Sequence, residues 1–129
     1  MIIIPDTNFL LYCAKQKIDY LREISEILNG REEIIILSRV LEELKKLKLK
    51  AHKLADRDSA SLALQILEKY LKEKKVKEIK SKGYADNTIR QLSKEQDTII
   101  ATLDKELKNR LQGAAGIITI FGKRSIKLI

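Results

Sequence analysis

Three aspartates stand out because their positions can bring carboxylates together at one edge of a sheet. Asp6, Asp86 and Asp104 each follow a short apolar run and each stand where a helix is expected to begin. In an open parallel sheet, ligands bind at the carboxyl ends of the strands, near the point where the strand order reverses. Asp is also a preferred helix N-cap, so any one of the three has a purely structural explanation. Three aspartates in phase with the strand ends favour a shared site.

A fourth candidate, Glu43, lies on the helix expected after the second strand. At about 100° per residue, this helix carries an apolar stripe made of Val40, Leu41, Leu44 and Leu47. Glu43 borders the stripe, whereas Glu42 points nearly to the opposite side, into solvent. We therefore expect Glu43, and not Glu42, to lean over the edge of the sheet.

The elements that must position these residues follow from the hydrophobic pattern. Apolar runs predict strands over residues 2–4, 34–37, 76–79, 98–101 and 117–121, with 126–129 as a candidate tail strand. Helical spacing predicts helices over about 20–28, 38–47, 52–74, 86–95 and 104–111, the second of them capped by Ser38. Ile-rich strands separated by helices indicate a parallel sheet covered on both faces. We predict an α/β fold, a three-layer α/β/α sandwich with a central, mostly parallel, about five-stranded sheet, as one domain over 1–129.

Composition narrows the class of protein. The chain has 129 residues, of which 44% are hydrophobic, enough for one domain with a real core. Cys13 is the only cysteine and His52 the only histidine, so neither an internal disulfide nor a Cys/His zinc site can form. The apolar runs are too short to span a bilayer, and the first residues carry no secretion signal. We therefore expect a cytoplasmic protein with no membrane partner.

The chain is strongly basic. Twenty-six Lys and Arg against 18 Asp and Glu give a formal net charge of +8, which attracts polyanions such as nucleic acid. A Lys- and Glu-rich surface of the thermophile type gives the same composition. The charge is uneven, because Lys69–Lys82 contains seven lysines in fourteen residues and Lys45–Lys53 contains five in nine.

The candidate acids also lie in segments that carry a family resemblance. Pro5–Asn8, Val40–Leu44, Ala85–Ile89 and Ala101–Asp104 resemble the four acidic motifs of PIN domains, in order and across nearly the whole chain. The resemblance implies a PIN-like ribonuclease that hydrolyses phosphodiester bonds of single-stranded RNA with Mg²⁺ or Mn²⁺, as one or two ions. It also implies roles for residues: Asp6, Glu43, Asp86 and Asp104 as catalytic metal ligands, with Asn8 and Thr102 orienting them. One departure is Asn87, where many members have a second acid.

The chemistry of such a cluster agrees with this implication. Four close carboxylates repel one another unless a cation is present, and an all-oxygen site suits Mg²⁺ or Mn²⁺. The ion would lower the pKa of a water for attack on the phosphodiester and neutralise charge in the transition state. A phosphate backbone beside this acidic edge needs positive flanks. The candidates for RNA contact are Lys45, Lys46, Tyr84, Lys105, Arg110, Lys123 and Arg124.

Several alternatives stay open. The resemblance runs towards archaeal-type PIN domains akin to RNA-processing nucleases, with ribosomal or transfer RNA as the candidate substrate. The toxin ribonucleases of toxin–antitoxin pairs share the same motifs, and an antitoxin protein would then be a partner. A catalytically inactive PIN-like module that binds RNA or protein is a third interpretation, which the presence of all four acids disfavours. PIN domains frequently pair, so a homodimer is also expected.

Overall fold

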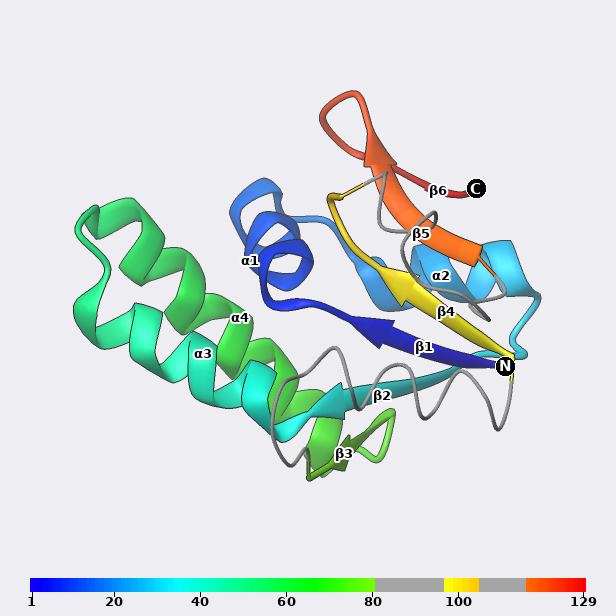
Figure 1. The fold of residues 1–129 in the computed structure, drawn as a ribbon, viewed down its shortest axis with the longest axis horizontal. Coiled ribbons are helices and arrows are strands. Elements are labelled where there is room, and N and C mark those ends of the chain that lie inside the picture. The colour runs from blue at the N-terminus through cyan, green and yellow to red at the C-terminus, as the bar shows by residue number, and fades with distance from the viewer. Residues whose placement is uncertain (81–96, 105–115) are drawn as a thin grey trace.

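The computed structural model describes residues 1–80, 97–104 and 116–129 (Figure 1). Four helices and six strands lie in these ranges. In chain order they are β1 (Ile2–Pro5), α1 (Thr7–Gln16), α2 (Tyr20–Leu28), β2 (Glu33–Leu37), α3 (Ser38–Lys50), α4 (Leu54–Lys72), β3 (Val76–Ile79), β4 (Thr98–Ala101), β5 (Gly116–Phe121) and β6 (Ser125–Leu128). The helices expected over 86–95 and 104–111 fall almost wholly outside the described residues.

The strands form one sheet in the order β3-β2-β1-β4-β5-β6, parallel except for β6. This confirms the predicted α/β class and mostly parallel sheet, but the sheet has six strands rather than about five. The additional strand is β6, which turns back at Gly122 (φ 62°) and pairs antiparallel with β5. The sequence signal was weak there because only Ile126 of its four residues is buried. The strand β3, which carries the exposed Lys77, lies at the other edge of the sheet.

The strand order reverses between β1 and β4. From β1 the chain first builds outward through β2 and β3, and then returns to place β4 and β5 on the other side of β1. The carboxyl ends of β1 and β4 therefore flank the crevice where open α/β sheets bind ligands. Ile2–Pro5 pairs with Thr98–Ala101 residue for residue, so both strands end at the same level.

The helices begin and end at local signals. Asp6 is the N-cap of α1, and Asn29 ends α2 in the left-handed conformation (φ 53°), followed by Gly30 (φ 74°). The prediction that Ser38 caps its helix was wrong, since Leu37 occupies the N-cap position and Ser38 is the first helical residue. The strand runs directly into α3 there, so the backbone leaves no separate cap residue.

One hydrophobic core joins the helices to the sheet. Ile3, Ile4, Ile36 and Ile100 of the central strands are fully buried, as the continuous apolar runs require. The longest helices, α3 and α4, form a hairpin at the β2–β3 side, and α1 packs against α4 (Figure 1). Among the described helices, none is long and apolar enough to cross a membrane.

Candidate functional site

The candidate site lies at the crevice between the carboxyl ends of β1 and β4. Asp6 directly follows β1, and its amide donates a hydrogen bond of 2.9 Å to the carbonyl of Ala101, the last residue of β4. Thr102 and Asp104 continue from β4, and the amide of Thr102 donates 2.9 Å to the carbonyl of Ile118 on β5. The backbone thus fixes two acidic segments side by side.

Asp6 serves as a helix cap and as a member of an acidic group. Its Oδ1 accepts a hydrogen bond of 2.8 Å from the amide of Phe9, and the Thr102 hydroxyl also bonds to its side chain. Burial is the largest cause that raises the pKa of Asp6 above 3.8, and the charges of Glu43 and Asp104 raise it further. The two hydrogen bonds act in the opposite direction but do not cancel the rise. Asp6 is therefore near enough to both Glu43 and Asp104 for their charges to act on it.

Thr102 links the two acidic segments. Its side chain is 1% exposed, and its Oγ1 accepts a hydrogen bond of 3.1 Å from the amide of Asp104. Because the same hydroxyl interacts with Asp6, the turn after β4 and the end of β1 are held in register. Asn8, the other residue expected to orient the acids, lies exposed on the first turn of α1.

Glu43 reaches the same region from α3. Its Oε2 accepts a hydrogen bond of 2.5 Å from the hydroxyl of Thr7, the first residue of α1, and its Oε1 lies 3.5 Å from Nε of Arg39. This contact agrees with the helix phase predicted from the apolar stripe. The contrast with Glu42 is one of contacts rather than exposure, because both glutamates are exposed and both line a cavity of about 340 Å³ beside α3.

Thr7 and Arg39 are the residues that sequence reasoning missed. Thr7 is 7% exposed, so its hydroxyl is a buried donor that has found a charged acceptor on another helix. Its place next to the N-cap gave no hint of this, since the bond depends on α1 packing against α3. Arg39 lies one helical turn before Glu43, a spacing that favours an ion pair.

The donor chemistry fits a hard divalent cation that is held loosely. The acids near Asp6 offer only oxygen, which Mg²⁺ and Mn²⁺ prefer. Within the described ranges, no three His, Cys, Asp or Glu side chains are grouped tightly enough to hold a metal ion, and Asp86 lies outside those ranges. Mg²⁺ does not need such a cage, because it commonly binds through one or two carboxylates and keeps several waters.

The basic residues expected to contact RNA are only partly described. Lys45 and Lys46 are exposed on α3, and Lys46 lines the same cavity as Glu43. Lys123 and Arg124 are exposed in the turn between β5 and β6, where the Lys123 carbonyl accepts 2.8 Å from the hydroxyl of Tyr12 on α1. The predictions for Tyr84, Lys105 and Arg110 lie outside the described residues.

Comparisons with known proteins agree with this geometry. The model of the family described as "PIN like domain" matches residues 2–123. Ribonuclease VapC4 of Methanocaldococcus jannaschii is 41% identical over 114 residues, covering 84% of this chain and 81% of the relative. The structure of the PIN domain endonuclease Utp24 superposes with a TM-score of 0.68 at 27% identity, covering 98% of this chain and 90% of that one.

A more distant structure shares the fold alone. The crystal structure of VapBC2 from Rickettsia felis, bound to a promoter DNA fragment, superposes with a TM-score of 0.58 at 17% identity, covering 94% of this chain and all of that one. The family model spans nearly the whole chain, and the relative named VapC4 is 41% identical over most of it. The chain belongs to the PIN-like domain family.

Proposed function

We propose that this chain is a metal-dependent endoribonuclease that hydrolyses phosphodiester bonds of single-stranded RNA in RNA processing. The observation that carries the proposal is the position of Asp6, which lies at the switch point of the sheet within electrostatic reach of Glu43 and Asp104. The 41% identical relative named a ribonuclease and the structural neighbour named an endonuclease support the reaction class.

In this proposal Asp6, Glu43, Asp86 and Asp104 hold one or two Mg²⁺ or Mn²⁺ ions. A bound ion supplies charge neutralisation at the scissile phosphodiester and lowers the pKa of a water. Thr102 keeps Asp6 oriented, and Thr7 holds the carboxylate of Glu43 at the edge of the site. Fixed ligand orientation matters because loss of such supporting hydrogen bonds typically lowers metal affinity or activity 10- to 100-fold.

The RNA backbone lies along the basic side of this site. Two cations, Arg39 and Lys46, line the cavity of about 340 Å³ together with two acids, Glu42 and Glu43, so a phosphate there meets both cations close to the acids. Lys123 and Arg124 extend the positive charge on the turn that packs against α1. Lys45 lies next to this path on α3.

A toxin ribonuclease of a toxin–antitoxin pair is the second candidate function. The relative named VapC4 favours it, and an antitoxin protein would then be the partner. The catalytic residues are the same in both roles, so the two differ in partner and RNA. Co-expression with the product of an adjacent small gene separates them: rescue of growth indicates a toxin, and no effect indicates a processing enzyme. A cytoplasmic homodimer suits either role.

The test of the catalytic proposal uses the two adjacent glutamates as a matched pair. In Mn²⁺ the wild type cleaves a labelled single-stranded RNA, and excess EDTA stops it. Glu43→Gln lowers the rate by about tenfold or more, because it removes a ligand charge, whereas Glu42→Gln stays within about twofold. Cleavage that persists in EDTA after a second purification would reject the metal-dependent mechanism. Equal losses at both positions would reject the assignment of Glu43.

A further inference from the structure

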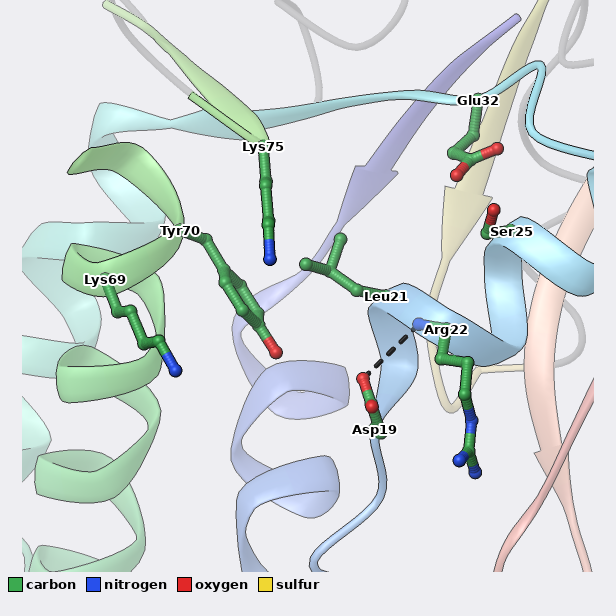
Figure 2. A pocket seen from close by; sticks show the side chains of 8 residues that line it. All are labelled: Asp19, Leu21, Arg22, Ser25, Glu32, Lys69, Tyr70 and Lys75. Carbon is green, nitrogen blue, oxygen red and sulfur yellow. Dashed lines mark hydrogen bonds between the residues drawn. The ribbon is translucent and has the colours of Figure 1, made fainter. Parts of the chain in front are cut away.

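A second polar cavity lies at the opposite end of the sheet from the acids. It has a volume of about 520 Å³ and opens between the start of α2 and the end of α4 (Figure 2). Two of its lining residues, Glu32 and Lys75, directly precede β2 and β3. The cavity is therefore at the amino ends of these strands, about 17 Å along β2 from the edge that carries the acids. Its volume lies in the range of small-ligand sites.

The surroundings of this cavity are positively charged. Arg22, Lys69 and Lys75 line it, together with two acids, Asp19 and Glu32. The stretch 69–80, which forms one wall and the adjoining edge strand, carries six exposed lysines against two glutamates. Glu73 neutralises only part of this charge, because its single carboxylate forms ion pairs with two lysines. Its oxygens lie 2.9 Å from Nζ of Lys75 and 4.0 Å from Nζ of Lys69. An excess of closely spaced lysines attracts phosphate groups.

Two further features suit a nucleobase. Figure 2 shows Tyr70, Leu21 and Lys75 pointing toward one another, so an aromatic ring and an aliphatic side chain form part of the wall. Glu32 contributes a carboxylate oxygen, Oε2, that is buried and receives no hydrogen bond from the described residues. A buried acceptor without a donor destabilises the structure that contains it, so a ligand N–H group gains by binding there. The Watson–Crick edge of guanine offers two such donors, N1–H and N2–H.

The acid at the mouth of the cavity does not oppose this binding. Oδ1 of Asp19 accepts a hydrogen bond of 3.3 Å from the amide of Arg22 (dashed in Figure 2) and caps α2. Its negative charge is thus directed at the helix N-terminus, where it is favourable.

We infer that this cavity is an RNA-binding exosite that takes one guanine nucleotide of the substrate. Tyr70 and Leu21 contact the base, Glu32 accepts from its Watson–Crick edge, and Lys69 and Lys75 contact the flanking phosphates. This inference rests on the proposed ribonuclease function. Because the exosite and the acids lie at opposite ends of the sheet, only an RNA long enough to pass along the molecule reaches both.

Binding in the absence of catalysis tests the exosite directly. In EDTA, the Kd for a labelled 2′-O-methyl RNA of about 15 nucleotides with one guanine is measured by fluorescence anisotropy. The double variant Lys69→Gln/Lys75→Gln raises this Kd at least about fivefold and lowers the salt dependence by about two counterions. The matched control Lys48→Gln/Lys50→Gln, which removes two exposed lysines of α3, stays within about twofold.

The base contact has its own control. Replacing the guanine by inosine removes only the N2 amine and weakens wild-type binding about tenfold or more, as loss of one hydrogen bond to a charged acceptor does. With Glu32→Ala, which removes both carboxylate oxygens, the two RNAs bind alike. Equal binding of both RNAs to the wild type would overturn the role of Glu32. If free GMP binds as tightly as the long RNA, the cavity is a mononucleotide site and not an RNA exosite.

Cleavage separates failure of the exosite from failure of the proposed function. The double lysine variant raises KM for the long RNA and leaves kcat/KM for an RNA of about four nucleotides unchanged, with melting temperature as the folding control. Equal effects on both lengths would mean that the lysines act through the catalytic site. If no RNA is cleaved but the Kd values differ as expected, the enzyme proposal fails and the binding site stands. Unchanged Kd values for the long RNA overturn the exosite.

Discussion

The hydrogen bond between Thr7 and Glu43 allows a quantitative test of how the site is held together. The bond joins α1 to α3 over 2.5 Å, with a buried donor and an acceptor side chain that is 46% exposed. A hydrogen bond to a charged group contributes about 1.5–3 kcal/mol, but water can replace the hydroxyl at the exposed carboxylate. We therefore expect a coupling of about 1 kcal/mol between the two side chains.

A double-mutant cycle isolates this coupling. The variants are Thr7→Val, which keeps the shape of the buried side chain, Glu43→Ala, and the combination. Their free energies of unfolding come from urea denaturation in EDTA at neutral pH. Glu43→Ala alone also relieves repulsion with Asp6, so its single effect can have either sign. The cycle removes that contribution and leaves the interaction with Thr7.

Activity gives the second measurement on the same variants. Thr7→Val frees the carboxylate of Glu43 and lowers RNA cleavage and Mn²⁺ affinity about tenfold, whereas Thr7→Ser retains the hydroxyl and most of both. A merely structural role for Thr7 would lower stability without changing the Mn²⁺ affinity of the folded protein. Additive free energies, within about 0.4 kcal/mol, would refute the coupling and with it the positioning of Glu43 by Thr7.

Three further predictions concern buried ionisable groups. Asp6→Asn keeps the helix cap but removes a charge whose folded pKa is raised above 3.8, so in EDTA near pH 7 it melts at or above the wild-type temperature. The wild type loses stability relative to this variant as pH rises from about 4 through the raised pKa of Asp6. Saturating Mn²⁺ stabilises the wild type by about 2–3 kcal/mol but the variant much less. If the variant melts well below the wild type in EDTA, the acids do not form a repulsive cluster. Burial, with a smaller effect of the Glu23 charge, raises the pKa of the Cys13 thiol from 9.0 to about 12, so at pH 8 the native protein reacts with Ellman's reagent about 1000-fold more slowly than the urea-unfolded chain. Because burial also raises the pKa of Tyr20, the fold loses stability as pH rises above about 9, and a flat alkaline stability profile by urea denaturation would argue against both shifts.

The central strands and the helix phases could be predicted from the sequence because burial constrains them strongly. A parallel strand covered on both faces must be apolar at nearly every position. The apolar runs that include Ile3, Ile35 and Ile100 therefore indicate buried central strands. The same holds for α3, where the apolar stripe determines on which side Glu43 lies. Asp6 was predictable as well, since the end of a strand and the start of a helix coincide there.

Features that depend on packing between distant segments could not be predicted in this way. The strand β6, which the sequence indicates only as a candidate tail strand, has one buried residue, Ile126, and pairs with the edge that β5 offers. The bond from Thr7 to Glu43 joins residues 36 apart, and nothing in the sequence next to Thr7 indicates its partner. The cavity between α2 and α4 likewise arises from residues whose spacing carries no signal, although the lysine run at 69–82 marked one of its walls.

Asp6 shows why the structural and functional interpretations of an aspartate at a strand end need not compete. From sequence, an N-cap and a metal ligand are alternative explanations for the same residue. In the structure the carboxylate caps α1 through Phe9 and also lies within the electrostatic reach of Glu43 and Asp104. The cap and the Thr102 bond lower the pKa that burial and the neighbouring acids raise, so they help to keep a buried carboxylate charged. A cation site needs charged, oriented ligands before the ion arrives, and at this position the start of a helix supplies both the donor and the orientation.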